Sequence, residues 1–182
     1  MVVYSYMFSQ TFMGEKIIVR PYQKEDISAW QKWDTDPDVQ RHMPELKNMP
    51  MSDEEQWAYF EECKSEQSAL YWSIVWKENQ KLIGTISLTD INEHHGVTEL
   101  GIVLGEKEYW GRGVAREAIE LILTFAKTHP KLRRIIAEYE EGNIAMGKAL
   151  EHAGFQQECV CRASRIKNGM PINTIRYYIL LQ

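Results

Sequence analysis

The segment with the most chemical content is a glycine-rich stretch, Trp110-Gly111-Arg112-Gly113-Val114-Ala115, set between an expected strand and an amphipathic helix. Glycines let the backbone adopt positive φ and approach a ligand closely. The N-terminus of a helix adds unpaired N–H groups and a partial positive charge. Together these features are typical of a phosphate or pyrophosphate site, to which Arg112 could add a charge-assisted contact.

Other interpretations of this stretch stay open. It could be a tight strand-to-helix turn that binds nothing. The Walker A pattern is absent, and a dinucleotide-binding loop would need glycine or alanine where the chain has Arg116. Glu138 follows at a distance comparable to that of the acidic residue in dinucleotide folds, so this interpretation is weakened and not excluded.

Histidines and cysteines indicate neither a metal site nor a disulfide framework. His94-His95 is interpreted as part of a solvated loop, because neighbouring histidines rarely share one metal and no third ligand is suitably spaced. Cys63, Cys159 and Cys161 form neither an even set nor a zinc spacing. Cys159 and Cys161 are expected on one face of a strand. We therefore expect reduced thiols and no metal.

Length and composition set the class of protein. The chain has 182 residues, of which 44% are hydrophobic and 26% charged, as in one soluble globular domain spanning 1–182. A net charge of −5 argues against a nucleic-acid partner, which would need a basic face. No apolar run approaches the roughly 18 residues of a membrane span. The first cation is Lys16, so no signal peptide is expected, and a cytoplasmic location is predicted.

Hydrophobic periodicity predicts the elements that position these residues. Helices are expected at 24–34, 53–65 and 113–128, and between an N-cap at Asn143 and Gly154; strands are expected at 16–22, 69–76, 81–90, 98–104, 132–140, 155–166 and 172–181. Asp36-Pro37-Asp38 should interrupt the first helical region, and a capping box from Ser52 to Glu55 should begin the second helix. Hairpins combined with one β-α-β crossover predict a mixed sheet with helices against its faces.

The order strand, glycine loop, long helix, strand, Asn143 and Ala153-Gly154-Phe155 resembles the GNAT superfamily of acyl-CoA N-acyltransferases over residues 17–181. Thr98-Glu99-Leu100-Gly101-Ile102 and Tyr109-Trp110-Gly111 are most similar to the Rim-type branch, which acetylates the N-termini of ribosomal proteins. Polyamine and antibiotic acetylases look similar too. The resemblance implies an α/β (α+β) fold: a mixed, mostly antiparallel sheet of six to seven strands, a central splayed parallel pair, and about four helices on both faces.

The resemblance also implies a cosubstrate and its site. Acetyl-CoA would lie in a V between the strands at 98–104 and 132–140. Gly113 and Ala115 match the family's Q/R-x-x-G-x-G/A pattern, with Trp110 in the first position. The pyrophosphate would sit on the amides of Gly111, Arg112, Gly113, Val114, Ala115 and Arg116, and the pantetheine arm would contact Ile102, Val103, Leu104 and the Asn143 side chain.

Catalytic roles follow from the same resemblance. Glu99 begins the strand that carries the thioester in this family, so it is the candidate general base, with Asp90 in reserve and an exposed edge glutamate as the alternative. An amide near Val103 or Leu104 would stabilise the oxyanion. Many family members carry a tyrosine where this chain has Leu150, and Rim-like members often carry a serine where it has Met146. Either another group protonates the leaving thiolate, with Tyr139 as the candidate, or CoA leaves as thiolate.

The acceptor is predicted only by class. Residues 24–62 hold eleven acids and four bases, and in the family these first helices flank the acceptor mouth, so an acidic rim would attract a cationic amine; a solvated helical face is the alternative. The expected activity is transfer of acetyl from acetyl-CoA to a primary amine within a ternary complex. A non-catalytic CoA-binding sensor is the rival, and a homodimer is compatible with either. Trp30, Trp33, Trp57, Trp72 and Trp76 could wall the acceptor pocket or form core.

Overall fold

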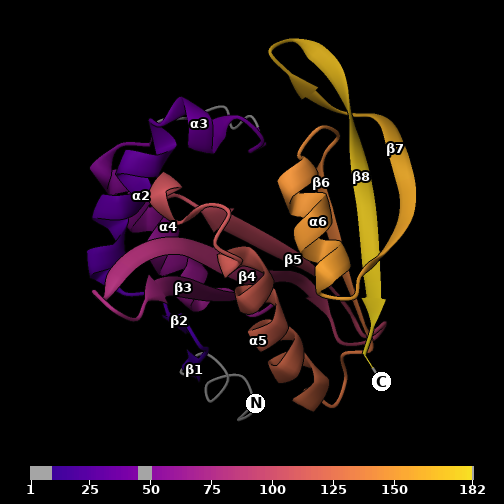
Figure 1. The fold of residues 1–182 in the computed structure, drawn as a ribbon, viewed down its shortest axis with the longest axis horizontal. Helices are drawn as coiled ribbons and strands as arrows, with labels where there is room; N and C mark the ends of the chain where they lie inside the picture. The colour runs from indigo at the N-terminus through magenta and orange to yellow at the C-terminus, as the bar shows by residue number, and fades with distance from the viewer. Residues whose placement is uncertain (1–9, 45–50, 182) are drawn as a thin grey trace.

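The computed structural model describes residues 10–44 and 51–181. An eight-stranded sheet of order β1-β2-β3-β4-β5-β6-β8-β7 forms its centre (Figure 1). The strands are β1 (Phe12–Met13), β2 (Ile17–Pro21), β3 (Leu70–Trp76), β4 (Lys81–Asn92), β5 (Val97–Leu104), β6 (Arg134–Glu140), β7 (Gln156–Lys167) and β8 (Met170–Leu180). Every neighbouring pair is antiparallel except β5 and β6, which confirms the predicted mixed sheet.

Helices cover both faces of this sheet. They are η1 (Lys24–Asp26), α2 (Ile27–Asp34), α3 (Pro37–Gln40), α4 (Asp53–Ser65), η2 (Lys107–Tyr109), α5 (Val114–Thr128) and α6 (Ile144–His152). Residues from α5 and α6 share a large apolar core with one face of the sheet, built around Trp72, Ile86 and Ile122. Residues from α2, α3 and α4 form a smaller apolar cluster with Val103, on the opposite side of β5 from the large core. In Figure 1 the two groups of helices lie apart, with α2, α3 and α4 on the left.

The central parallel pair separates after a short contact. Val97, Thr98 and Glu99 of β5 pair with residues 134–136 of β6, and no further ladder pairs join these two strands. β5 continues to Leu104 while paired with β4 alone among the described residues. The expected splayed pair is therefore present, with Glu99 as the last paired residue of β5.

Several local predictions are confirmed in atomic detail. The Ser52 hydroxyl accepts from the Glu55 amide at 3.2 Å, and the Glu55 carboxylate accepts from the Ser52 amide at 2.7 Å. Asn168 and Gly169 have φ of 51° and 73°, as a two-residue hairpin turn requires. Gly154 has φ 90° just after α6, where a left-handed residue ends the helix.

The predicted interruption of the first helical region is confirmed, but the short helix that follows it was not predicted. α2 ends at Asp34, the Asp36 carboxylate accepts from the Asp38 amide, and α3 begins at Pro37, which occupies the first helical position. The two-residue β1 is an eighth strand that no alternation could reveal. Trp57 is 38% exposed with Lys24 over its ring, whereas Trp30, Trp33 and Trp72 are buried core residues. Within the described ranges no helix is both long and apolar enough to cross a membrane.

Candidate active site

The glycine loop leads into α5 with an open surface above its backbone. Gly111 and Gly113 have φ of 72° and 80°, a conformation that side chains rarely adopt. A Cβ built on either glycine would meet no atom within 4 Å, so both face open space. Gly113 is the N-cap of α5, and no described side chain caps this helix end. The loop therefore offers uncapped amides beside an open surface, which fits a pyrophosphate.

Cations of the loop already have neighbours within the protein. The Arg112 guanidinium lies 5.3 Å from the Tyr109 ring centre and 6.0 Å from that of Trp76. Arg116 forms an ion pair with Glu120 one turn along α5. The main-chain carbonyl of Arg112 accepts from Lys16 Nζ at 3.1 Å. Because these side chains already contact other residues, the main-chain amides of the loop are the groups available to bind a ligand.

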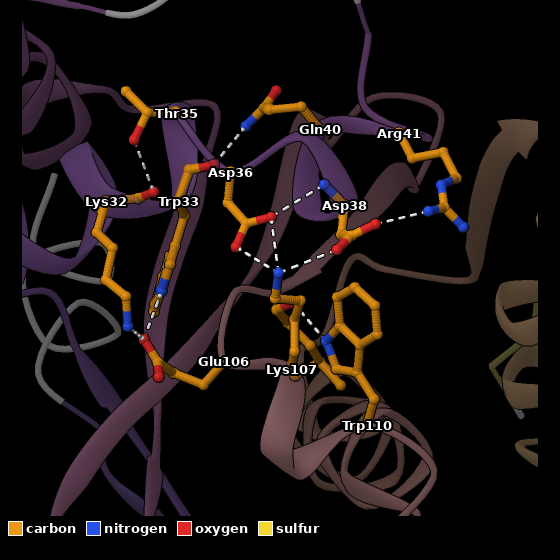
Figure 2. A network of polar contacts seen from close by, with 11 residues as sticks. Lys32, Trp33, Thr35, Asp36, Asp38, Gln40, Arg41, Glu106, Lys107 and Trp110 are labelled. Carbon is orange, nitrogen blue, oxygen red and sulfur yellow. Dashed lines mark hydrogen bonds and ion pairs between the residues drawn. The ribbon is translucent and has the colours of Figure 1, made fainter.

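A buried carboxylate fixes the segment between β5 and the loop (Figure 2). Glu106 is 6% exposed and accepts from Trp33 Nε1 and Lys32 Nζ, both at 2.9 Å; Lys81 Nζ lies 2.7 Å from its other oxygen. Burial alone would raise the pKa of Glu106, but these three donors lower it to about 2. The neighbouring Gly105 lies so close to Trp33 that a Cβ would fall 1.9 Å from the indole ring.

Two further contacts hold this segment against α3 and the end of β5. Lys107 Nζ lies 2.8 Å from Asp36 and 3.0 Å from Asp38. Trp110 Nε1 donates to the Leu104 carbonyl at 2.8 Å, so the indole folds back onto the strand end (Figure 2). The loop entrance is thereby connected both to the N-terminal helices and to β5.

Glu99 occupies the point where β5 and β6 separate. Register pairs it with Ile136, and alternation along β6 places Glu138 on the same face. The Glu99 carboxylate makes no hydrogen bond or ion pair with any residue in 10–44 or 51–181. Burial raises the pKa of Glu99, and the charges of Glu138 and Asp90 raise it further, against the opposing effect of Arg165 and Arg176. Such a carboxyl group is suited to accept a proton.

Glu138 is a member of this site that sequence reasoning missed. Its carboxylate accepts from Thr174 Oγ1 at 2.8 Å and from Arg176 Nη2 at 2.8 Å, with Arg165 Nη2 3.4 Å away. Burial would raise the pKa of Glu138, but these partners lower it, so the group carries a full negative charge beside Glu99. The sequence did contain a signal for this residue. Glutamates stand at 138 and 140, on one face of β6, while Ile135, Ala137 and Tyr139 make the other face apolar.

Tyr139 lies on the opposite face of β6 from Glu138. It is 9% exposed and belongs to the core under α6, where a Cβ on Gly147 would come within 2.5 Å of its hydroxyl oxygen. Burial raises the pKa of Tyr139, and a hydrogen bond with Tyr177 lowers it.

Asn143 is the N-cap of α6. Its Oδ1 accepts from the Met146 amide at 3.2 Å, which leaves its amide nitrogen for other contacts.

The remaining predicted contacts lie on β5. Ile102, Val103 and Leu104 are all half-buried and follow the last residue paired with β6. Met146 is half-buried and Leu150 is fully buried, so neither position presents an acidic group. His94 and His95 are exposed in the turn before β5, and no group of three metal-binding side chains was found among the described residues.

Comparisons with known proteins agree with this geometry. A family model for the acetyltransferase (GNAT) domain matches residues 16–156. The uncharacterized N-acetyltransferase p20 of Bacillus licheniformis is 28% identical over 175 residues, covering 94% of this chain and 96% of its own. The uncharacterized N-acetyltransferase YoaA of Bacillus subtilis is 27% identical over 168 residues, covering 91% and 94%.

Solved structures share the fold. Spermidine N-acetyltransferase from Vibrio cholerae, in complex with CoA and spermine, has a TM-score of 0.82 at 21% identity, covering 91% of this chain and 96% of that one. A GNAT-family acetyltransferase from Bacillus anthracis has a TM-score of 0.80 at 20% identity, covering 94% and 98%.

The splayed strands, the glycine loop and the family match together define the class: the chain belongs to the GNAT acetyltransferase domain family. It is accordingly an enzyme, an acetyl-CoA-dependent N-acetyltransferase.

Proposed function

We propose that the protein transfers the acetyl group of acetyl-CoA directly to a primary amine, with Glu99 as the general base. Acetyl-CoA supplies the activated thioester. The amides of Gly111, Arg112, Gly113, Val114, Ala115 and Arg116 hold the pyrophosphate, and the free edge of β5 at Ile102, Val103 and Leu104, with Asn143, receives the pantetheine arm. The observation that carries the proposal is the unpaired, half-buried Glu99 at the separation of β5 and β6.

Glu99 accepts the proton that the attacking amine must lose. A free alkyl ammonium has a pKa near ~10, so a nucleophilic nitrogen has to be generated in the site. A carboxyl group with a raised pKa does so more readily than an ordinary glutamate. Tyr139 is the proposed acid for the departing thiol, and release of CoA as thiolate is the alternative.

A cationic acceptor fits the charges around Glu99. Neither Glu99 nor Asp90 makes a hydrogen bond or ion pair through its side chain within the described residues. The acidic residues of segment 24–62 contribute less to attraction of a cationic acceptor than expected, because several form ion pairs within the protein. The pairs are Asp26 with Arg20, Asp36 and Asp38 with Lys107, Asp38 with Arg41, and Glu61 with Lys64. Glu45 and Lys47 of that segment lie outside the described residues. Attraction of a cation is therefore assigned to Glu99 and Asp90.

The test is thiol release from acetyl-CoA with a panel of amines. Spermidine and spermine represent the polyamine acceptors, since spermine is bound in the Vibrio cholerae structure. Peptides with ribosomal-protein N-termini represent the Rim-type branch that residues 98–111 resemble. Saturable turnover with one amine class, lost in Glu99→Gln, supports the proposal and names the acceptor. Binding of acetyl-CoA without turnover on any amine identifies a sensor instead. The homodimer and the cytoplasmic location stay predictions.

Binding of the cosubstrate is tested separately by calorimetry. Acetyl-CoA should bind saturably, with NAD and NADP as negative controls. A bulky side chain at Gly113 should abolish binding, because it would fill the open space above the loop. A substitution at Gly169, which also has positive φ but lies in the distant β7–β8 turn, is the matched control for backbone strain.

A further inference from the structure

Two cysteines lie side by side on β7, an outer strand of the sheet. The sulfur atoms of Cys159 and Cys161 are 3.7 Å apart, which is van der Waals contact. Cys159 is exposed and Cys161 is half-buried, and both are free thiols. A disulfide needs a sulfur separation of about 2.05 Å. The two sulfur atoms therefore need to move only a short distance toward each other to form a disulfide.

Irregular strand pairing flanks the two cysteines on both sides. The register of β7 against β8 shifts between Gln157 and Cys159, and again between Cys161 and Arg165. Ala163, between the second pair, has φ 50°. In a regular strand, residues i and i+2 lie near the upper limit of Cα separation that a disulfide tolerates. Cys159, Val160 and Cys161 pair regularly with Arg176, Ile175 and Thr174, so ring closure needs a small bend of the strand, which the bulges on either side can accommodate.

The two thiols also interact electrostatically. Contact with Cys161 raises the pKa of Cys159, and Arg176, its partner in the β8 register, acts in the opposite direction. Cys161 Sγ lies 3.9 Å from Glu138 Oε2. The third cysteine differs in its accessibility: Cys63 is buried, and burial raises its pKa to about 11. A thiol in that state is inert, because the thiolate is the reactive form.

We propose that Cys159 and Cys161 form a modification site, a dithiol that a low-molecular-weight disulfide oxidises reversibly to an intrastrand disulfide. One thiolate of the pair attacks a sulfur of the small disulfide, whose S–S bond breaks and releases one small thiol. The second thiolate attacks the resulting mixed disulfide and expels the other small thiol. Two electrons pass from the protein to the oxidant, and the two protons end on the released thiols. Excess reductant reverses both steps.

Oxidised glutathione applied to the full-length folded protein tests this proposal. Remaining thiols are then alkylated in denaturant, and the chain is digested with trypsin. Cleavage after Lys148 and Arg162 places both β7 cysteines on one peptide, residues 149–162, while Cys63 falls on another that ends at Lys64. The 149–162 peptide should lose two hydrogen atoms and both alkyl labels, and dithiothreitol should restore them. The Cys63 peptide should keep its label throughout.

Single variants identify the intermediate. Cys159→Ser and Cys161→Ser should each stop at a mixed disulfide carrying one glutathione, whereas Cys63→Ser should behave as the parent chain. Ring closure should be slower in urea-unfolded chain than in folded chain, since the fold holds the sulfurs in contact. The proposal fails if the peptide keeps both labels, carries glutathione on both cysteines, joins two chains, or closes equally fast when unfolded.

Discussion

A single carboxyl group carries the proposed chemistry, and its surroundings set the pH range in which it can act. Burial raises the pKa of Glu99, and the negative charges of Glu138 and Asp90 add to this, while Arg165 and Arg176 oppose it. A general base must be deprotonated, so the rate should fall as the pH drops through this raised pKa. The acidic limb of the rate profile should therefore lie above the ordinary range of a glutamate.

Glu99→Gln should lower kcat by about 10²–10⁴-fold, the usual contribution of a general base. Affinity for acetyl-CoA should stay unchanged, because the amide keeps the shape of the side chain. Thiol release and calorimetry measure the two quantities. The matched variant is Asp90→Asn, which removes a nearby negative charge and so should move the acidic limb to lower pH while turnover persists. A fully active Glu99→Gln enzyme would refute the assignment.

Tyr139→Phe tests the proposed acid. Loss of the hydroxyl should lower kcat by about 10²-fold, the lower end for general acids, because a thiolate is already a tolerable leaving group. The KM for acetyl-CoA should be unaffected. Tyr177→Phe removes the hydrogen-bond partner of Tyr139 and serves as the structural control. Equal rates for Tyr139→Phe and parent enzyme would mean that CoA leaves as thiolate.

At the scale of elements, the connection between β5 and α5 depends on one buried anion. The Glu106 carboxylate contacts three donor groups, from Lys32 and Trp33 of α2 and from Lys81 of β4, so it connects elements that are distant in the chain. Its pKa is about 2 in the folded protein, against 4.5 for an ordinary glutamate. A depressed pKa stabilises the folded state fully above the unfolded value, and this stabilisation is lost as the pH falls toward 2.

Glu106→Gln should lower the free energy of unfolding by about 1–3 kcal/mol near neutral pH, because a buried carboxylate with charged donors is lost. The difference between the variant and the parent should shrink as the pH is lowered through about 4.5 toward 2. Urea unfolding at a series of pH values measures it. Lys107→Met, which removes exposed ion pairs only, should cost less than about 1 kcal/mol. A pH-independent difference would contradict the role given to Glu106.

Elements were predicted well where their signal is local. The capping box at Ser52, the Asn168-Gly169 turn and the apolar stripe of α5 each depend on residues close in sequence, and each is present. The start of α3 was missed, although Asp36 before Pro37 is itself a helix N-terminal signal. The Glu106 contacts could not be predicted, because Trp33 and Glu106 are 73 positions apart and only the folded sheet brings them together.

At the scale of the whole molecule, two apolar clusters stabilise the helices on the two sheet faces. The smaller cluster includes Trp30, Trp33, Val39 and Phe60. Gly105 lies against the Trp33 ring with no space for a side chain. The N-terminal helices are therefore attached to the end of β5 through a contact that only glycine permits.

Gly105→Ala should lower the free energy of unfolding by about 1–3 kcal/mol through overpacking against Trp33. Thermal and urea unfolding measure the change. Gly101→Ala is the matched control, since its Cβ would meet only the rotatable Ser87 hydroxyl, at 2.9 Å. Equal stability of both variants would show that the Trp33 contact is more adaptable than the packing indicates.

The candidate site, too, was predictable only where it depends on residues that are close in sequence. The glycine loop was found from sequence because its glycines and the following helix are contiguous. The role of Glu99 is implied by a family resemblance, and the sequence indicates its neighbour Glu138 only as the acidic residue of a possible dinucleotide-binding fold. Their adjacency depends on the parallel register of β5 and β6, which no pattern within either strand specifies.

The early separation of β5 from β6 gives this sheet an unusual property. From Leu100 to Leu104, β5 pairs with β4 alone among the described strands, although four strands precede it and three follow it in the sheet order. An interior strand thus has main-chain groups without a strand partner on one side, as an outer strand has, although the Leu104 carbonyl accepts from Trp110 Nε1. The fold therefore places main-chain groups without a strand partner in the centre of the sheet, with strands on both sides, and not only at its outer edges.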